Sequence, residues 1–233
     1  MRVSVSNVMP AVQPQHHISD ELLFDYAAGT CDEAQSLLVA SHLSYCQTCR
    51  RRLAELETLG GALMADIEVA PEPENSLSFD ALLSRIDDMY LQTPVESEPP
   101  PAQTSAPAWV PGPLKPYVAD DLSGAWRSVT RGIDEVPLET SGRLSRAKLL
   151  RIRAGTKVPQ HTHAGSELTL VMQGSFIDGD ETFLAGDVAI GDSDLDHCPA
   201  AGPEGDCICL VVLDAPLRLT GPVGRFLNPF VKL

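Results

Sequence analysis

The chain has 233 residues, of which 43% are hydrophobic, and it carries a formal net charge of −15, a composition within the range of globular proteins. No apolar run approaches the roughly 20 residues that a transmembrane helix requires. The first residues, MRVSVSNVMPAVQPQHH, lack the apolar core of a signal peptide. We therefore expect a cytoplasmic protein that does not associate with membranes. In a reducing compartment its six cysteines are expected to be metal ligands, reactive thiols or core residues rather than disulfides.

The negative charge is distributed unevenly along the chain. Residues 1–113 contain 5 Lys and Arg against 16 Asp and Glu, whereas residues 114–233 contain 12 against 16. Affinity for nucleic acid depends largely on Lys and Arg contacts to phosphates, so the acidic first part argues against direct DNA binding. Such a surface suits a basic protein partner instead.

The sequence before residue 90 has the apolar periodicity of four short helices. Ser19 can cap a first helix through ELLFDYAAG that ends at Gly29, and a second helix covers DEAQSLLVASHL. A third runs from about Thr48 to Asp66 with a stripe of leucines, and a fourth covers SFDALLSRIDDMY after the potential cap Ser78. Because four short helices have little core of their own, we expect a small bundle that a metal ion or a partner stabilises.

The chain then changes character twice. Residues 91–116 are rich in Pro, Ser, Glu and Ala, with little that could form a core, and we interpret them as an extended, semi-rigid linker. The later segments AKLLRIRAG, ELTLVMQGSFIDG, DETFLAGDVAIG and CICLVVLDAPLRL have the length of strands and are separated by turn residues. The sequence thus predicts a helical domain over residues 1–90, a linker over 91–116 and a β-sandwich or jelly roll over 117–233.

The segment HLSYCQTCRRR contains three potential zinc ligands, which are His42, Cys46 and Cys49. Residues four apart lie on one face of a helix, and a CxxC at a turn or helix start brings two thiolates to one ion. A structural zinc site requires a fourth ligand. Three candidates lie upstream: His16, His17 and Cys31. Helical geometry does not choose among them. Zinc bound here would contribute about 10 kcal/mol or more to apparent folding energy.

A second group of potential ligands fits the pattern GxxxxxHxHxxxExxxxxxG. It runs from Gly155 to Gly174 and contains His161, His163 and Glu167. Two histidines two residues apart on a strand point the same way, so one divalent ion could bridge them and the glutamate.

Further on, His197 follows a Gly-Asp turn at Gly186 and Asp187. Together with the first pattern, this arrangement resembles the cupin fold, whose two motifs supply three histidines and one glutamate to a metal inside a jelly roll. The second motif is degenerate, because the proline before its glycine is absent and no asparagine follows the histidine. Such a ligand set suits Zn, Fe, Mn or Ni and does not select among them.

The stretch HHISDELLFDYAAGTCDEAQSLLVASHLSYCQTCR resembles the zinc-binding anti-sigma domain of bacterial anti-sigma factors. The order of the two metal motifs is similar to that of the ChrR family, in which this domain precedes a cupin. The resemblance places the fourth zinc ligand of the helical domain at His17 and implies zinc in the cupin as well. It further implies that the helical domain binds and inhibits an extracytoplasmic function (group IV) sigma factor. A sigma factor is a basic-patched protein, which fits the acidic first part of the chain.

We expect the fourth predicted helix to dock on that partner, because it stands furthest from the zinc ligands and next to the linker. Its apolar residues at helical spacing are Phe79, Leu82, Leu83, Ile86 and Met89. Packing in the core of the helical domain is the alternative role for these residues.

The function of the cupin has two possible interpretations. Members of the ChrR family respond to singlet oxygen or organic peroxides, and this resemblance implies a metal-binding sensor of oxidative signals that triggers release of the sigma factor. The alternative is a metal-dependent cupin oxygenase with a helical regulatory appendage, since cupin dioxygenases use the same ligands. The sequence permits enzymatic chemistry but contains no obvious basic clamp for a substrate, and the fusion to a domain that resembles an anti-sigma domain favours a sensor, so we expect no enzymatic activity. We expect Cys207 and Cys209 to be small core residues, because a disulfide between positions i and i+2 is strained.

Overall fold

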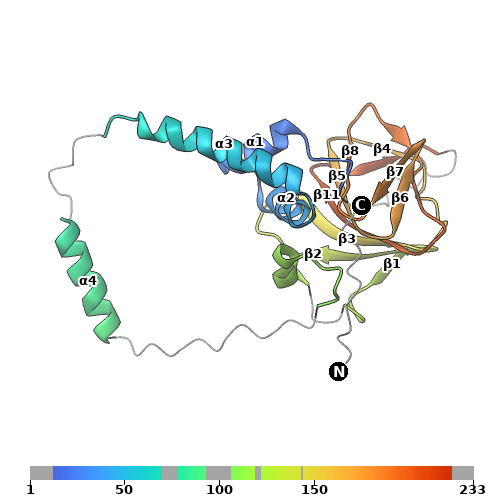
Figure 1. Ribbon diagram of the computed structural model, residues 1–233. Coiled ribbons are helices and arrows are strands. Elements are labelled where there is room, and N and C mark those ends of the chain that lie inside the picture. The colour runs from blue at the N-terminus through green and yellow to red at the C-terminus, as the bar shows by residue number, and fades with distance from the viewer. Residues whose placement is uncertain (1–12, 70–77, 93–105, 119–121, 143, 222–233) are drawn as a thin grey trace, which may run out of the picture. The chain divides into compact units, whose positions relative to one another are not determined.

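A computed structural model describes residues 13–69, 78–92, 106–118, 122–142 and 144–221 (Figure 1). Contacts divide the chain into two units, of which the larger combines Met1–Thr58 with Ser105–Leu233 and the smaller is Leu59–Thr104. The first two helices therefore belong to the same unit as the β-domain. This division by contacts differs from the boundaries 1–90, 91–116 and 117–233, which stay a prediction about the organisation of the chain.

The two helices of the larger unit begin and end at residues with local capping signals. Helix α1 spans Asp20–Ala28, between the N-cap Ser19 and Gly29, whose φ of 71° gives the left-handed conformation that ends many helices. Helix α2 spans Glu33–Tyr45 and begins with a capping box at Asp32. Both helices lie where the sequence predicts them.

The remaining two helices have little buried surface. Helix α3 spans Gln47–Ala65 and helix α4 spans Phe79–Gln92. The leucine stripe predicted on α3 becomes exposed in its second half, where Leu59 and Leu63 are 55% and 63% exposed. The shared helical core is therefore formed by α1, α2 and the beginning of α3. Among the described residues, none of the helices has both the length and the apolar character needed to cross a membrane.

Twelve antiparallel strands form the β-domain within the described residues. Six are joined in one sheet, in the order β1-β2-β3-β11-β5-β8. Two smaller sheets have the orders β10-β6-β7 and β12-β4-β9. The strand bounds are β1 Arg127–Thr130, β2 Ile133–Leu138, β3 Arg146–Ile152, β4 His161–His163, β5 Glu167–Gln173, β6 Ser175–Asp178, β7 Glu181–Leu184, β8 Val188–Gly191, β9 Asp196–His197, β10 Ala200–Ala201, β11 Cys207–Leu213 and β12 Leu217–Leu219. The chain thus has helices followed by a β-rich, cupin-like domain, as predicted.

Strand β11 is buried on both faces, which explains its uninterrupted apolar sequence CICLVVL. Its residues Leu210 and Val212 belong to the same hydrophobic core as Leu38 of α2, because α2 packs against β11 and β5. The alternate residues, such as Cys209 and Val211, belong to a second core inside the β-domain. Helix α2 therefore covers the outer face of the six-stranded sheet (Figure 1).

Part of the predicted linker is folded. Residues 112–117 form the 3₁₀ helix η1, Gly112–Tyr117, which packs on α2. Val110 and Leu114 are 4% and 0% exposed and join the core between α2 and the sheet. These apolar residues explain the difference from the prediction, since they give the end of the Pro-rich stretch a surface to bury. Residues 93–105 of the predicted linker lie outside the described residues.

Candidate metal centres

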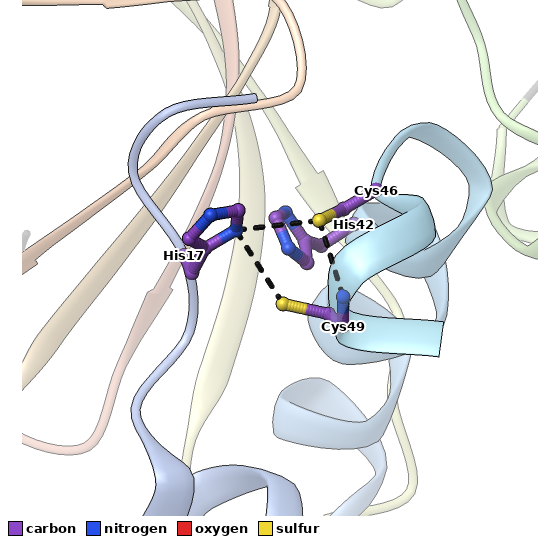
Figure 2. A group of neighbouring side chains, drawn as sticks. All are labelled: His17, His42, Cys46 and Cys49. Atoms are coloured by element: carbon purple, nitrogen blue, oxygen red, sulfur yellow. Dashed lines mark hydrogen bonds between the residues drawn. The ribbon is translucent and has the colours of Figure 1, made fainter. Parts of the chain in front are cut away.

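The helical centre lies where the segment before α1 meets the junction of α2 and α3 (Figure 2). Its four residues come from the end of that segment, the last turn of α2, the cap of α2 and the first turn of α3: His17, His42, Cys46 and Cys49. One potential ligand atom of each lies within 4.8 Å of the others. Nδ1 of His17 is 3.3 Å from Sγ of Cys46 and 3.6 Å from Sγ of Cys49. Ligand atoms on a tetrahedral zinc ion are separated by about 3.5 Å, given zinc–ligand bonds of about 2.0–2.3 Å.

The other two candidates for the fourth ligand lie elsewhere. The ring of His16 packs against Phe183, with the ring centroids 4.2 Å apart. Sγ of Cys31 lies 3.9 Å from the carbonyl oxygen of Leu22. The structure therefore places His17, rather than His16 or Cys31, beside the two thiols.

The tautomer of His42 also fits a metal ligand. Its Nδ1 is 2.8 Å from the carbonyl oxygen of Gly186, and because a carbonyl can only accept, Nδ1 must donate. The other nitrogen, Nε2, then carries the free lone pair. It is buried and has no hydrogen-bond partner in the described part of the chain. Buried acceptors are normally paired, and a metal ion bound among the four residues would pair with this nitrogen.

Burial controls the protonation of this centre in the absence of a metal. It lowers the pKa of His42, which keeps the imidazole neutral as a metal ligand must be. Burial and the hydrogen bond with Cys46 raise the pKa of the Cys49 thiol to about 12. A metal ion bound here would therefore displace a proton. Two sulfur and two imidazole ligands in tetrahedral proximity suit zinc.

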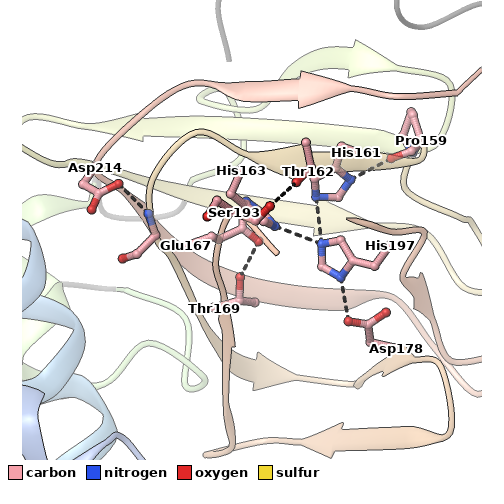
Figure 3. A network of polar contacts seen from close by, with 11 residues as sticks. Pro159, His161, Thr162, His163, Glu167, Thr169, Asp178, Ser193, His197 and Asp214 are labelled. Atoms are coloured by element: carbon pink, nitrogen blue, oxygen red, sulfur yellow. Dashed lines mark hydrogen bonds and ion pairs between the residues drawn. The ribbon is translucent and has the colours of Figure 1, made fainter. Parts of the chain in front are cut away.

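The cupin centre is formed by three histidines on the sheet β12-β4-β9 (Figure 3). His161 and His163 point the same way from β4, and His197 pairs with His161 across β9. Nε2 of His197 lies 3.1 Å from Nε2 of each of the other two. The three imidazoles thus each place a nitrogen within 4.8 Å of the others, close enough to hold one metal ion.

Two of these histidines are oriented by groups behind them. Nδ1 of His161 lies 2.7 Å from the carbonyl oxygen of Pro159. Nδ1 of His197 lies 2.6 Å from a carboxylate oxygen of Asp178. In both cases Nδ1 donates, which leaves Nε2 as the acceptor toward the centre. Burial lowers the pKa of His161, and burial together with the two neighbouring histidines lowers the pKa of His163 to about 4.

Glu167 lies beside this group rather than within it. It is the first residue of β5, and its Oε2 is 3.8 Å from Nδ1 of His163. Its other oxygen accepts a hydrogen bond of 3.1 Å from the Thr169 hydroxyl. Burial raises the pKa of Glu167. The role of Glu167 as fourth ligand stays a prediction, while the histidines form a group that could hold Zn, Fe, Mn or Ni.

A cavity of about 490 Å³ adjoins the cupin centre. His197 and Glu167 line it, and its wall continues to His16 and His17 of the segment before α1. The apolar part of its lining includes Phe176. The cavity therefore borders residues of both predicted metal centres.

Two cysteines of the β-domain, Cys207 and Cys209, are core residues, whereas Cys198 is exposed. Sγ of Cys207 lies 3.4 Å from Sγ of Cys209, and both side chains are fully buried. The hydrogen bond with Cys207 and burial raise the pKa of Cys209 well above its usual value, so this thiol is poorly ionised.

Three residues that support the centres were not predicted from the sequence as functional. These are Asp178, Gly186 and Asp187, which contact ligands or the segment that carries them. Gly186 and Asp187 are visible in the sequence only as a turn, and Asp178 belongs to the acidic stretch IDGDE, which has no distinctive spacing.

Comparison with known proteins agrees with the arrangement of helices followed by a β-domain. Residues 115–216 match the family described as the ChrR Cupin-like domain. The chain is 41% identical over 220 residues to the anti-sigma-E factor ChrR of Cereibacter sphaeroides. The aligned residues cover 94% of this chain and 99% of the relative. It is similar to a chain in the crystal structure of Rhodobacter sphaeroides SigE in complex with the anti-sigma ChrR, with a TM-score of 0.71, 38% identity and coverage of 87% of this chain and 100% of that chain.

A likeness to an acetylacetone dioxygenase from Acinetobacter johnsonii is much weaker. The TM-score is 0.41 and the identity 19%, over 46% of this chain and 79% of that chain. This likeness is too low to bear on activity. The similarity to ChrR, in contrast, extends over nearly the whole of both chains. The chain therefore belongs to the ChrR family of anti-sigma factors.

Proposed function

We propose that this chain is a cytoplasmic anti-sigma factor that binds and inhibits an extracytoplasmic function sigma factor. Zinc in the helical centre stabilises the binding helices. The cupin domain binds a second metal, which is zinc, iron, manganese or nickel, and an oxidative signal such as singlet oxygen or a peroxide acts there to release the sigma factor. The observation that carries the proposal is the full-length similarity to a protein that was crystallised with SigE.

Helix α4 supplies a surface suited to such a partner. Its residues Phe79, Leu82, Leu83 and Ile86 share one face of the helix and are 72%, 46%, 42% and 41% exposed. Exposed apolar side chains at this spacing are typical of helices that dock in a groove of another protein. The side chain of Met89, which was predicted to join this face, lies outside the described residues.

The acidic character of the first part of the chain favours a basic partner. Residues 1–113 contain 16 Asp and Glu against 5 Lys and Arg. Complementary charge speeds association and excludes other partners more than it raises affinity. The apolar face of α4 would supply the affinity, and the acidic surface would supply the selectivity for a DNA-binding protein over DNA itself.

The test is co-purification of the full-length chain with each extracytoplasmic function sigma factor encoded in the same genome, followed by calorimetric titration of the pair that forms. Substituting Ile86→Asp should weaken binding of the sigma factor at least tenfold. Because Ile86 is exposed, the same substitution should change the folding stability of the chain by only about 0.5 kcal/mol. Ser84→Asp is the matched control, because it adds the same charge to the same helix away from the apolar face. Unchanged affinity of the Ile86→Asp chain would exclude α4 as the docking helix. Failure to retain any sigma factor would refute the proposed function.

One observation favours a second candidate function. The cavity of about 490 Å³ beside the histidines could admit a small substrate, as in a metal-dependent cupin oxygenase with a helical regulatory appendage. Such an enzyme would consume oxygen with a small acid or thiol and would lose turnover on Glu167→Ala. Absence of oxygen uptake across a substrate panel, with iron or manganese bound, would leave the anti-sigma function as the better explanation of the chain.

A further inference from the structure

The histidine His42 of the helical centre is held by the β-domain. Its Nδ1 donates to the carbonyl oxygen of Gly186 over 2.8 Å, in the turn between β7 and β8. His42 is completely buried, so this bond fixes which nitrogen faces the thiols and at what angle. The residue that orients one ligand of the helical centre thus lies 144 positions away along the chain.

The next residue of the same turn holds the segment that carries His17. Oδ1 of Asp187 accepts hydrogen bonds from the backbone N–H groups of Gln15 (2.7 Å) and His16 (2.9 Å). The backbone N–H of Val188 donates to the carbonyl oxygen of His16 over 3.2 Å. Asp187 is itself buried, with 3% of its surface exposed. These three bonds end one residue before His17 and determine where its backbone lies.

The turn also fits closely against the two segments that carry ligands. Gly186 has a φ of 98°, which side chains rarely allow. A Cβ added there would lie 2.8 Å from Cγ of Pro14 and 2.9 Å from Cβ of Tyr45. Pro14 precedes His17 by three residues, and Tyr45 adjoins Cys46. The backbone of the turn can approach both segments only because residue 186 has no side chain.

We propose that residues 186–188, which we call the clasp, position both histidine ligands of the helical centre, and that the centre therefore depends on the β-domain to retain its metal. The inference rests on the proposed metal in that centre. The two thiols come from the α2–α3 junction, whereas His17 and His42 are held by Asp187 and Gly186. Groups that orient metal ligands in this way typically change metal affinity by about 10–100-fold when they are altered.

The location of the clasp connects the helical centre to the cupin centre. Strand β8 begins at Val188, within the clasp, and ends at Gly191, which pairs with Glu167. A Cβ added at Gly191 would lie 2.8 Å from Nε2 of His163. One strand of four residues therefore contacts the clasp at one end and the cupin centre at the other. A change at the cupin centre that displaces β8 would loosen the histidines of the helical centre.

The experiment uses the full-length chain loaded with Co²⁺. Of the two groups of potential metal ligands in the described residues, only the helical one contains cysteines, so the near-ultraviolet thiolate-to-cobalt charge-transfer band reports that centre. Loss of the band is followed after rapid mixing with excess EDTA. Gly186→Ala and Asp187→Asn should each release cobalt about 10–100-fold faster than the unaltered chain.

Gly155→Ala is the matched control for Gly186→Ala. Gly155 also has a positive φ, of 68°, but a Cβ there would meet nothing within 4 Å. It reproduces the backbone strain in the β-domain without pushing on the helices, and its cobalt release should equal that of the unaltered chain. If Gly186→Ala does not fold, Asp187→Asn decides the outcome, because it retains the shape of the side chain; circular dichroism establishes folding for each chain.

The outcomes separate the clasp from the proposed function. Equal release rates from the unaltered, Asp187→Asn and control chains would overturn the clasp and leave the anti-sigma function untouched. Absence of the charge-transfer band from the unaltered chain would overturn the helical metal centre and the clasp together. Binding of the sigma factor, measured by co-purification, tests the anti-sigma function independently of both.

Discussion

His197 donates a hydrogen bond of 2.6 Å from its Nδ1 to a carboxylate oxygen of Asp178 (Figure 3). The carboxylate fixes the ring orientation and the tautomer, so that Nε2 faces the other two histidines. Carboxylates behind a histidine also make it a better electron donor to a metal. Asp178 is therefore expected to determine how tightly the cupin centre holds its ion.

Substituting Asp178→Asn should lower the metal affinity of the cupin centre by about 10–100-fold, because the amide is a weaker acceptor and leaves the ring free to adopt the other tautomer. The affinity is measured by competition with a chromophoric chelator in a Cys46→Ala background, so that only the cupin centre contributes. Asp180→Asn, at an exposed residue of the turn that follows β6, serves as the control. Equal affinities of the two variants would show that Asp178 does not support the centre.

Two adjacent histidines provide a test of the helical centre. His17 lies 3.3 Å from the thiol of Cys46, whereas His16 packs on Phe183. His17→Ala should abolish the thiolate-to-cobalt charge-transfer band or weaken cobalt binding by more than about 100-fold, since it removes a ligand rather than a supporting group. His16→Ala should retain the band, because the clasp still holds the backbone of residue 16 and loses only the contact of 3.4 Å between Oδ2 of Asp187 and Nδ1 of the His16 ring. Reversal of the two results would move the fourth ligand to His16.

Local signals in the sequence predicted the helices, their ends and the ligand groups. The contacts between segments far apart in the sequence could not be predicted in this way. The ends of α1 follow from Ser19 and Gly29, because capping acts within a few residues. The HxxxCxxC and HxH spacings likewise predict which side chains meet, since helix and strand geometry fixes them. The contact of His42 with Gly186 joins residues 144 positions apart and has no local signature.

One sequence feature indicates that the sheet is covered on both faces, although it does not identify α2 as the element that covers the outer face. A strand that faces solvent alternates apolar and polar residues, but CICLVVL is apolar throughout and must be covered on both faces. The same reasoning applies to Val110 and Leu114 in the Pro-rich stretch, which are buried against α2. Composition alone classifies that stretch as a linker, because it does not reveal that a neighbouring apolar surface is available.

Glu33 attaches the N-terminal end of α2 to the β-domain. Its carboxylate accepts hydrogen bonds from the hydroxyls of Tyr117 (2.7 Å) and Ser141 (2.6 Å) and from the Ser141 backbone N–H. The bonds from Ser141 and then Tyr117 lower the pKa of Glu33. A lowered pKa in the folded state means that the contribution to stability is complete above the unfolded pKa of about 4.3 and is lost as the pH falls through the folded pKa.

Glu33→Gln should therefore lower the melting temperature near neutral pH, and the difference from the unaltered chain should shrink as the pH falls below the unfolded pKa of about 4.3 and through the lowered pKa of folded Glu33. The measurement is thermal unfolding at a series of pH values with the metal-free protein, so that acid release of metal does not contribute. Glu21→Gln, an exposed glutamate in the first turn of α1, is the control. A difference that is the same at every pH would assign the effect to lost packing rather than to the charge of Glu33.

The two centres are expected to have different effects on the sigma factor. Cys46 lies in the helical centre, so Cys46→Ala should loosen α2 and α3 and weaken binding by at least about tenfold, in line with the large folding energy of structural zinc. Cys31→Ala is its control, because that thiol lies outside the centre. His163 lies in the cupin centre, and His163→Ala should preserve binding while abolishing release by singlet oxygen or peroxide. The affinity of each variant, measured before and after oxidant treatment, distinguishes these effects. If the Cys46 and His163 variants lost binding alike, sensing and binding would share one centre, and the cupin could not act as a separate sensor.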